Sequence, residues 1–412
     1  MSGSDTRSSQ LIKLLILITV PIIMWRFYWY VGFDHNATSL LSFILSAFLV
    51  VYLFVIWVNG NLRYYSEGSL YSRLVLLILF NVFLSMINAY AYWGQGIVLT
   101  FRAGYIFFII IYFFLLYSTD VSYDDIVRLV LFFSFVYLLL WLYAVSQSPQ
   151  VVFGNYDEVS DDRGFARIIN LSSVDLVYLA YFISLVKVSS GNSENKLVWI
   201  GVLVVSLLLI IGTLTRTVIV ATILVSGIYL LRRRPGYLII AVIVTIVASG
   251  YLVYNEVASS LFDLTYETFE FGPESALRIV EYTQFADFYP FNIGTFLFGN
   301  GSPHVESDYG AFEEFLKSDY FFNRSDAGPV GMYVTFGIVS IVLFTIVLIR
   351  VIKQKVSDDA MPFKLFVIFL FIINLTSWKF FKFGISFMIC LYILDLDHKS
   401  GYLGLRRSYY DD

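Results

Sequence analysis

The sequence has few charged residues, one cysteine and three histidines. Only 14% of its 412 residues are charged, where a soluble domain has about 25%. It has a single cysteine, Cys390, so no intramolecular disulfide can hold an external segment, which must be held by packing. Its three histidines, His35, His304 and His398, are too widely separated to predict a metal site. We therefore expect neither a soluble domain nor a metal centre.

Apolar residues, by contrast, make up 58% of the chain and occur in long continuous runs. A hydrocarbon core about 30 Å thick needs roughly 20 apolar residues per helix, whereas a membrane β-barrel would need alternating segments of about ten residues. The sequence therefore predicts an all-α polytopic membrane protein with about 12 transmembrane helices. The expected spans are 11–32, 38–59, 70–93, 97–118, 126–146, 166–188, 197–213, 216–232, 236–254, 328–350, 362–377 and 381–397.

The lysines and arginines predict the orientation of these spans. Most of them fall in one set of alternate loops, which includes the run Arg232, Arg233 and Arg234. Because such residues accumulate on the cytoplasmic side, we expect both termini in the cytoplasm. The first apolar stretch, 11–32, has no small-residue cleavage site and is expected to stay as a span. The stretch 362–397 is predicted as two short helices, with a single broken span as the alternative.

One long segment without a span separates two membrane regions. Residues 255–327 carry 13 carboxylates and three basic residues, and we predict that they form a large external loop with short amphipathic helices. Residues 1–254 would contain spans one to nine, and residues 328–412 spans ten to twelve and a cytoplasmic tail. In the loop, SALRIVEYTQFADFY places apolar residues on one side of a short helix that would carry Arg278. LFGNGS, further on, predicts a turn.

Arg216 interrupts a long apolar run in GTLTRTVIV. An arginine inside a membrane helix costs roughly 2.5–3.5 kcal/mol to insert, so such residues are by default functional candidates. Its planar guanidinium could hold a phosphate through two parallel hydrogen bonds. The alternative is an interfacial arginine, where one helix ends and the next begins, whose charged end reaches water.

Two residues of the acidic segment are further candidates. Arg278 is one of few cations there and could meet an anionic substrate, or it could pair with Glu274 or Glu281 at helical spacing. Asp326, just ahead of span ten, could take a proton from a substrate hydroxyl at the membrane surface. Equally, an aspartate in this position could cap the helix by accepting hydrogen bonds from its first free N–H groups.

Other polar residues are weaker candidates for contact with a substrate. Arg26 and Arg102, near the external ends of spans one and four, could be anchors or could line a groove for a lipid phosphate. Asp175 lies inside span six and is expected to face the interior of the bundle. Arg324, one of the basic residues of the acidic segment, completes this set of substrate-binding candidates.

Taken in order, these motifs resemble the O-antigen polymerase and O-antigen ligase superfamily of bacterial membrane glycosyltransferases. GTLTRTVIVATIL is similar to the family's apolar run that ends in a small or hydroxyl residue followed by arginine. SALRIVEYTQFADFYP and LFGNGS are similar to its second arginine, on a loop helix followed by a Gly-x-Gly turn. SDAGPVGMYVTFGIVSIVLF is similar to the segment that leads into the next span. The motifs fall within residues 197–350, and the topology covers the whole chain.

The resemblance favours the polymerase branch. Ligases of this superfamily usually have a histidine where this chain has Asp326 and an asparagine where it has Ala327. An acidic residue there is more similar to the polymerases. The Pro-Asn pattern often found in the family's middle span is absent from RIINLSSVDL, so the resemblance gives no role to Asn170 or Asp175.

The resemblance implies a GT-C-like architecture and a reaction at the periplasmic face of the bacterial inner membrane. A growing glycan would pass from undecaprenyl diphosphate to the non-reducing end of a lipid-linked repeat unit, without metal, cofactor or nucleotide sugar. Arg216 and Arg278 would stabilise the leaving diphosphate, and Asp326 would activate the acceptor hydroxyl. The expected partners are the lipid-linked oligosaccharide, membrane lipids and, as a further candidate, a chain-length regulator, with no nucleic acid.

Other functions are compatible with the same features. A ligase would differ only in its acceptor, moving finished glycan to a lipid or protein. A lipid-linked oligosaccharide flippase would also have about twelve spans, but the sequence shows neither the internal repeats nor the interrupted helices that transporters often have. In a scaffold protein, Arg216, Arg278 and Asp326 would be an anchor, a salt bridge and a helix cap.

Overall fold

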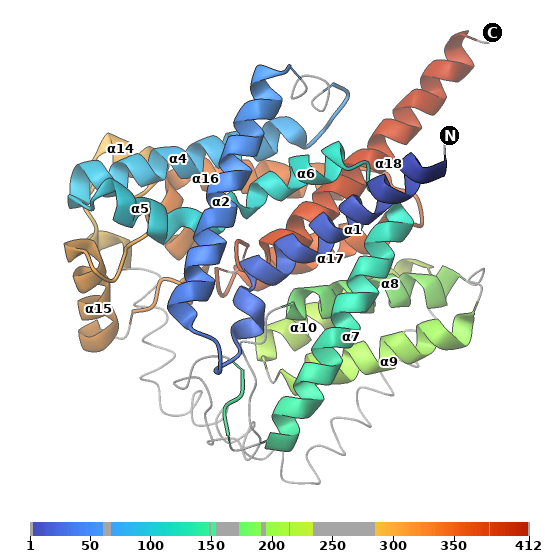
Figure 1. The fold of residues 1–412 in the computed structure, drawn as a ribbon, viewed down its shortest axis with the longest axis horizontal. Helices are drawn as coiled ribbons and strands as arrows, with labels where there is room; N and C mark the ends of the chain where they lie inside the picture. Colours follow the sequence, from blue (N-terminus) through green and yellow to red (C-terminus); the bar gives the residue numbers. More distant parts are fainter. Residues whose placement is uncertain are drawn as a thin grey trace.

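The computed structural model describes residues 3–60, 67–147, 150–153, 173–190, 195–213, 215–233, 285–320, 322–378 and 380–410 (Figure 1). Within these ranges the protein is built of helices, and the only β-bridge joins Tyr30 to Phe153. The prediction of an all-α protein is thus confirmed for the described residues. The predicted span 236–254 and Arg278 lie outside them.

Helices of membrane-spanning length and composition are present. Among the described residues, five helical segments are long and apolar enough to cross a membrane. They are Asn36–Val58, Ser72–Trp93, Ile97–Ser118, Tyr123–Gln147 and Gly328–Lys353. Shorter apolar helices run over Leu15–Met24, Lys196–Gly212 and Met361–Asn374. These helices indicate a helical membrane protein, and the number of spans stays a prediction.

The helices follow the expected spans. In chain order they are α1 (Gly3–Met24), η1 (Arg26–Trp29), α2 (His35–Val58), α4 (Ser72–Trp93), α5 (Ile97–Gly104), η2 (Tyr105–Ile111), α6 (Tyr112–Ser118), α7 (Tyr123–Gln147), α8 (Val174–Ser190), α9 (Lys196–Gly212), α10 (Arg216–Arg233), η5 (Phe285–Phe288), α14 (Ile293–Phe298), α15 (Asp308–Tyr320), α16 (Gly328–Lys353), α17 (Met361–Asn374) and α18 (Gly384–Tyr410). The first predicted span ends early, because η1 takes left-handed dihedral angles.

Local sequence signals set several helix ends. Asp34 accepts a hydrogen bond from the N–H of Asn36 at the start of α2 (2.9 Å). Ser122 and Asp125 form a reciprocal capping box at the start of α7. Gly94 ends α4 in the left-handed conformation, which glycine adopts without steric cost.

The predicted spans 362–377 and 381–397 are two separate helices, so the alternative of a single broken span is wrong. Gln354, which precedes α17, donates from Nε2 to the carbonyl of Leu394, three turns into α18 (2.7 Å). The two helices therefore run antiparallel and form a hairpin. Its turn is closed by Asn374, whose side-chain oxygen accepts from the N–H of Phe380 (3.1 Å). The turn is lined with the buried aromatic side chains of Phe380, Phe381 and Phe383.

Helix α16 is interrupted at Gly337, and the expectation of uninterrupted helices is wrong. Gly337 has φ 72° and ψ −177°, a conformation essentially restricted to glycine. A Cβ atom there would lie 2.3 Å from the carbonyl carbon of Leu297 and 2.4 Å from the backbone nitrogen of Phe298. The backbone at the C-terminal end of α14 therefore packs directly against the break, and only glycine fits there.

Three carbonyl groups beside the break accept hydrogen bonds from other elements. Asn300 donates from its N–H to the carbonyl of Val334 (2.8 Å), Gly301 from its N–H to that of Thr335 (2.9 Å), and Asn81 of α4 from Nδ2 to that of Phe336 (2.8 Å). Unpaired backbone groups cost several kcal/mol each in a hydrocarbon setting. The α4 helix and the segment after α14 thus stabilise the broken α16.

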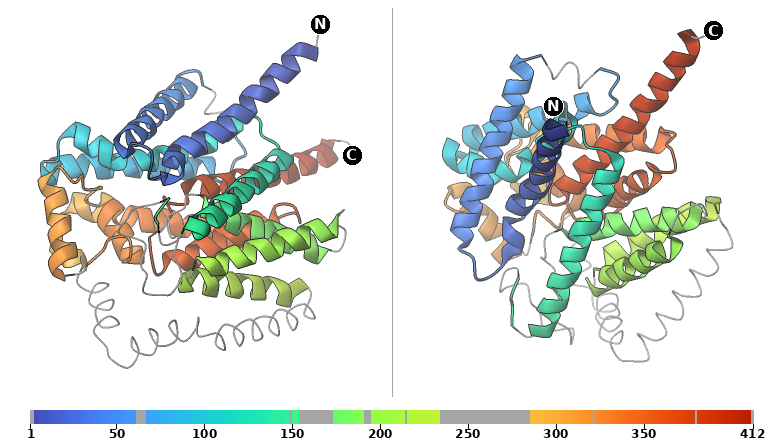
Figure 2. Two further views of the ribbon diagram at one scale, coloured as in Figure 1. Left: turned by 60° about the horizontal axis from the view of Figure 1, so that its bottom comes forward. Right: turned by 45° about the vertical axis from the view of Figure 1, so that its right-hand side comes forward.

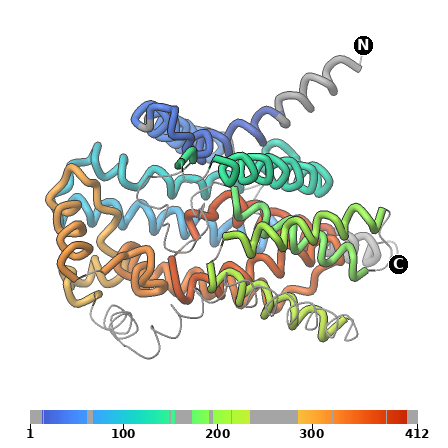
Figure 3. The backbone as a smooth tube through the Cα atoms, turned by 90° about the horizontal axis from the view of Figure 1, so that it is seen from below, coloured from blue at the N-terminus to red at the C-terminus, as the bar shows by residue number. Residues whose placement is uncertain are grey.

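The ends of α1 and α18 lie away from α15. Figures 1 and 2 show the N-terminal end of α1 and the C-terminal end of α18 on the side of the molecule away from α15. Figure 3 shows α15 across one end of the long helices. Residues that follow α15 therefore approach the bundle from the side opposite to these two helix ends.

Candidate functional site

An aromatic cluster joins three elements that are far apart in the sequence. It consists of Phe107 in η2, Phe336 beside the break in α16, and Trp378 and Phe381 in the α17–α18 turn. The ring centroids of Phe107 lie 4.9 Å from Phe336 and 4.8 Å from Phe381, and those of Phe336 and Trp378 are 5.5 Å apart. We call these four residues the aromatic junction. They fix the relative positions of the polar residues around them.

Asp326 is attached to the aromatic junction through its own turn. The backbone N–H of Trp378 donates to the carbonyl of Ser325 (2.8 Å), which holds the turn against the α17–α18 hairpin. The Asp326 side chain is exposed and accepts a hydrogen bond from the Ser325 hydroxyl (3.3 Å). The N-terminal capping position of α16 is Ala327, which makes no side-chain capping bond. The interpretation of Asp326 as the helix cap is therefore wrong, and its carboxylate faces outward on a fixed backbone.

Arg216 is the first residue of α10 and is exposed. At the other end of this helix, Arg233 forms an ion pair with Asp358, just ahead of α17. Because α10 packs along α17 and its 18 residues span about 27 Å, Arg216 lies near the end of α17 that leads into Trp378. The guanidinium of Arg216 is thus at the same helix end as the first free N–H groups of α10. A helix N-terminus with a cation beside it is suited to binding a phosphate.

Asp175 lies in the first turn of α8 and is only 2% exposed, so the expectation that it faces the interior is confirmed. At the far end of α8, Lys187 pairs with Asp359 (2.9 Å). Asp175 is therefore at the same end of the α8, α10 and α17 helices as Arg216, but inside the bundle.

Arg26 follows α1 and is held from two sides. Its Nε donates to the hydroxyl of Tyr105 (3.0 Å), and its guanidinium lies over the ring of Trp29, 4.3 Å from the centroid. The four residues of η1 have φ between 49° and 61°, a conformation that costs side-chain-bearing residues roughly 1–2 kcal/mol each. Tyr105 precedes Phe107 by two residues in η2, so Arg26 binds the same element that carries Phe107 of the aromatic junction.

Arg102 contacts the segment between α14 and α15. It pairs with Glu306 (3.2 Å) with both side chains about half exposed, so the pair contributes little to stability. The N–H of Glu306 donates to Nδ1 of His304 (3.2 Å). Burial, and then the charge of Arg102, lower the pKa of His304, which keeps the imidazole neutral and able to accept. In this structure Arg102 thus has a protein partner.

Arg324 is buried and bonded within the protein. Its Nη1 donates to the carbonyl of Gly301 (2.8 Å), its Nη2 donates to the hydroxyl of Tyr309 (2.9 Å), and it forms an ion pair with Glu313 of α15. Burial acts to lower the pKa of Arg324, but Glu313 and the neighbouring tyrosines outweigh it and raise the pKa well above its usual value. The geometry gives Arg324 the role of fixing α15 to the start of α16.

Replacing Glu313 by glutamine should test this role. The change leaves the buried Arg324 without its counter-charge, so we expect the protein to lose about 2 kcal/mol of stability. The matched control is Glu314→Gln, which removes the same charge from the exposed neighbouring position and should change stability by less than about 0.5 kcal/mol. Apparent melting temperatures of the two variants in the same detergent measure the difference. Equal melting temperatures would show that Arg324 does not depend on the ion pair.

The structure thus groups some candidates and separates others. Asp326 and Arg26 are attached to elements of the aromatic junction. Arg216 and Asp175 lie in the first turns of α10 and α8, at the same end of the bundle. Arg102 and Arg324 bind other parts of the protein. Within the ranges that the structure describes, no group of three or more His, Cys, Asp or Glu residues could hold a metal ion.

Sequence reasoning missed a row of polar side chains on α4. Asn81 binds the break in α16, and Asn88 donates from Nδ2 to the carbonyls of Gly294 (2.9 Å) and Gly299 (2.7 Å). With Ser85, these residues follow the spacing i, i+4, i+7 within an apolar helix, which is one face of a helix. This spacing could have predicted a buried polar contact on α4.

No protein-family model matches the chain, and comparison with curated proteins finds no match. The class is therefore defined by the fold and composition alone, as a helical membrane protein with polar and cationic residues around the aromatic junction.

Proposed function

We propose that this chain is a polysaccharide polymerase of the O-antigen polymerase type, with a GT-C-like architecture. It would move a growing glycan from undecaprenyl diphosphate to the non-reducing end of a lipid-linked repeat unit. The observation that supports this most is Asp326, an exposed carboxylate on a turn that the Trp378 N–H holds in place. Acceptor hydroxyls are weak nucleophiles, and a fixed carboxylate is a suitable general base for them.

The bond changes assign a role to each residue. The acceptor oxygen would bond to the anomeric carbon of the donor as the bond between that carbon and the diphosphate oxygen breaks. Asp326 would take the proton of the acceptor hydroxyl. Negative charge then grows on the leaving diphosphate, where Arg216, and by the resemblance Arg278, would stabilise it. Arg26, held over the ring of Trp29, is a further candidate for contact with the carrier.

The proposed location is the bacterial inner membrane, with both termini cytoplasmic and the reaction at the periplasmic face. In support, α15 lies on the side of the molecule away from the N-terminal end of α1 and the C-terminal end of α18, and the Asp326 turn follows α15 in the chain. The lysine and arginine distribution assigns the side of those two helix ends to the cytoplasm.

A transporter of lipid-linked oligosaccharides is the second candidate, because α16 is interrupted and transporters often bind substrate at interrupted helices. In such sites, the backbone carbonyl groups that the interruption leaves unpaired bind the transported substrate or ion. Here the carbonyls of Val334, Thr335 and Phe336 accept hydrogen bonds from the protein itself. The break is thus filled by the protein, which favours the polymerase.

The test is extension of a lipid-linked repeat unit by purified protein in nanodiscs, followed on a carbohydrate gel. We expect wild type to give a ladder without nucleotide sugar or added metal, and Arg216→Gln to reduce its rate about 100-fold or more, because a donor aimed at developing charge is worth that much. The control is Arg73→Gln, an exposed arginine at the start of α4. A folded wild type that makes no ladder but flips the lipid-linked unit in proteoliposomes would identify a transporter, and transfer of finished glycan to another acceptor would identify a ligase.

A further inference from the structure

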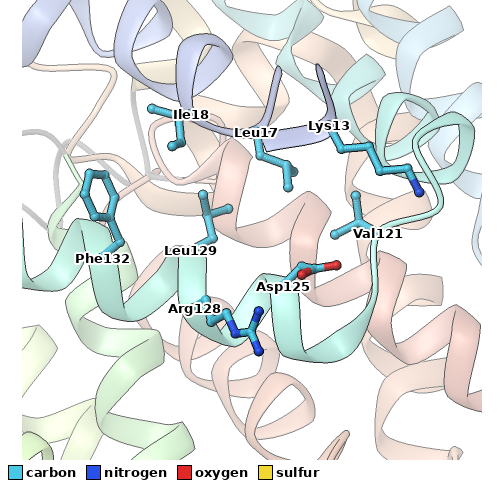
Figure 4. Close-up of a pocket in the computed structure, with 8 residues that line it drawn as sticks. All are labelled: Lys13, Leu17, Ile18, Val121, Asp125, Arg128, Leu129 and Phe132. Carbon is cyan, nitrogen blue, oxygen red and sulfur yellow. The ribbon is translucent and has the colours of Figure 1, made fainter. Parts of the chain in front are cut away.

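A second site lies between α1 and α7, away from the aromatic junction. The two helices enclose a pocket of about 570 Å³, within the range of roughly 300–1,000 Å³ that binding sites for organic ligands have. Its walls are Lys13, Leu17, Ile18, Val121, Asp125, Arg128, Leu129 and Phe132 (Figure 4).

The pocket is at the opposite end of the bundle from Arg216 and Asp326. The ring of Tyr123, the first residue of α7, lies 5.6 Å from the Nζ of Lys187, and Lys187 pairs with Asp359 ahead of α17. This is the end at which α8 and α10 finish. A ligand here would therefore be separate from the one that reacts at the aromatic junction.

On each of the two helices, an apolar residue of the pocket wall follows a cation by one helical turn. On α1, Leu17 follows Lys13 by four residues, and on α7, Phe132 follows Arg128 by four residues. Residues at this spacing are neighbours along one helix face. Figure 4 shows both helices running in the same direction, with Val121 beside Lys13, Asp125 between Lys13 and Arg128, and Phe132 toward the far end of the pocket. The pocket wall thus combines two cations and one carboxylate with apolar side chains.

The cations are available to a ligand. Lys13 makes a single long hydrogen bond, to the carbonyl of Asp120 (3.4 Å). Among the described residues, Arg128 has no hydrogen bond or ion pair. The one carboxylate of the wall, Asp125, accepts hydrogen bonds from the hydroxyl (2.7 Å) and N–H (3.2 Å) of Ser122, so it is occupied in capping α7. With two cations and one carboxylate, the wall carries a net charge of +1.

We propose that this pocket binds an anionic phospholipid of the surrounding membrane. Lys13 and Arg128 bind the headgroup phosphate, and an acyl chain lies against Leu17, Leu129 and Phe132. A molecule with a phosphate at one end and a hydrocarbon chain at the other matches this wall, in which an apolar residue follows each cation by four residues. Basic pockets between membrane helices recognise anionic headgroups in this way. The lipid fills the pocket between α1 and α7.

The test is native mass spectrometry of the purified full-length chain after incubation with phosphatidylglycerol or phosphatidylcholine vesicles. We expect retention of phosphatidylglycerol over phosphatidylcholine. The Lys13→Gln/Arg128→Gln double variant should bind phosphatidylglycerol about 25-fold more weakly, because each cation near an anionic headgroup contributes about fivefold. Both positions are on the pocket wall and outside the buried core, so the variant should stay folded.

The control is Lys353→Gln/Lys355→Gln, which removes two exposed cations around the end of α16 and should leave binding unchanged. Inorganic phosphate at millimolar concentration should not displace the lipid, since it lacks the chain. Equal retention of both lipids by wild type, full retention by the double variant, or equal loss in the control variant would overturn the proposal. None of these outcomes depends on whether the protein is a polymerase.

Discussion

Replacing Asp326 by asparagine should lower the rate of glycan extension about 100-fold or more, because removal of a positioned general base typically has an effect of this size. The amide keeps the shape of the side chain and its hydrogen bond from the Ser325 hydroxyl but cannot take a proton. The rate is measured as single-turnover extension of a lipid-linked unit in nanodiscs. Binding of the acceptor should change little, so the loss should fall on kcat rather than on KM.

The chain offers a closely matched control at Asp319. This residue is also exposed and also accepts a hydrogen bond from the serine before it, Ser318 (2.7 Å), but it lies at the end of α15. Asp319→Asn removes the same charge from the same acidic segment and should leave the rate unchanged. If both variants lose activity alike, the effect comes from the charge of the segment, and Asp326 is not the base.

Replacing Gly337 by alanine should destabilise the protein by about 2–6 kcal/mol, the sum of two costs. The backbone conformation costs a side-chain-bearing residue about 1–3 kcal/mol. The new Cβ would lie 2.3 Å from the backbone of Leu297, and overpacking of this kind costs about 1–3 kcal/mol more. The expected result is a large fall in the apparent melting temperature in detergent, or no monodisperse protein.

Two other glycines separate these costs. Gly94 also has positive φ, but a Cβ there meets nothing within 4 Å, so Gly94→Ala should cost only about 1–2 kcal/mol. Gly201 lies within α9 in open space, and Gly201→Ala should be neutral or stabilising by up to about 1 kcal/mol. If Gly337→Ala is no worse than Gly94→Ala, the C-terminal end of α14 does not pack against the break.

The positions of the helices could be predicted from the sequence, because continuous apolar runs mark membrane helices strongly. The segment 97–118 and the helices that begin at Arg216 and Gly328 start where the pattern indicates. The break in α16 could not be predicted, since a single glycine in an apolar helix is common. What creates the break is the backbone of residues 297–301, and the sequence does not show that these residues meet Gly337.

The candidate site was only partly accessible to sequence reasoning. An exposed Asp326 before a helix is visible in the sequence, but its attachment depends on the N–H of Trp378, and backbone contacts leave no trace in residue types. Arg324 was considered for substrate binding because it is a rare cation among acids. The same fact explains its observed partner, since a carboxylate of α15 was close enough to bind it. The role of Arg278 rests on the resemblance alone.

The hydrogen bonds around Gly337 also bear on how the protein is made. The donors that satisfy the break belong to α4 and to residues 300 and 301, and all of them precede α16 in the chain. They are therefore already synthesised when α16 leaves the ribosome. The helix can meet its partners as it inserts, without waiting in the bilayer with unpaired carbonyl groups. A circularly permuted chain that begins at α16 would lose this order and should insert poorly even though its final contacts are the same.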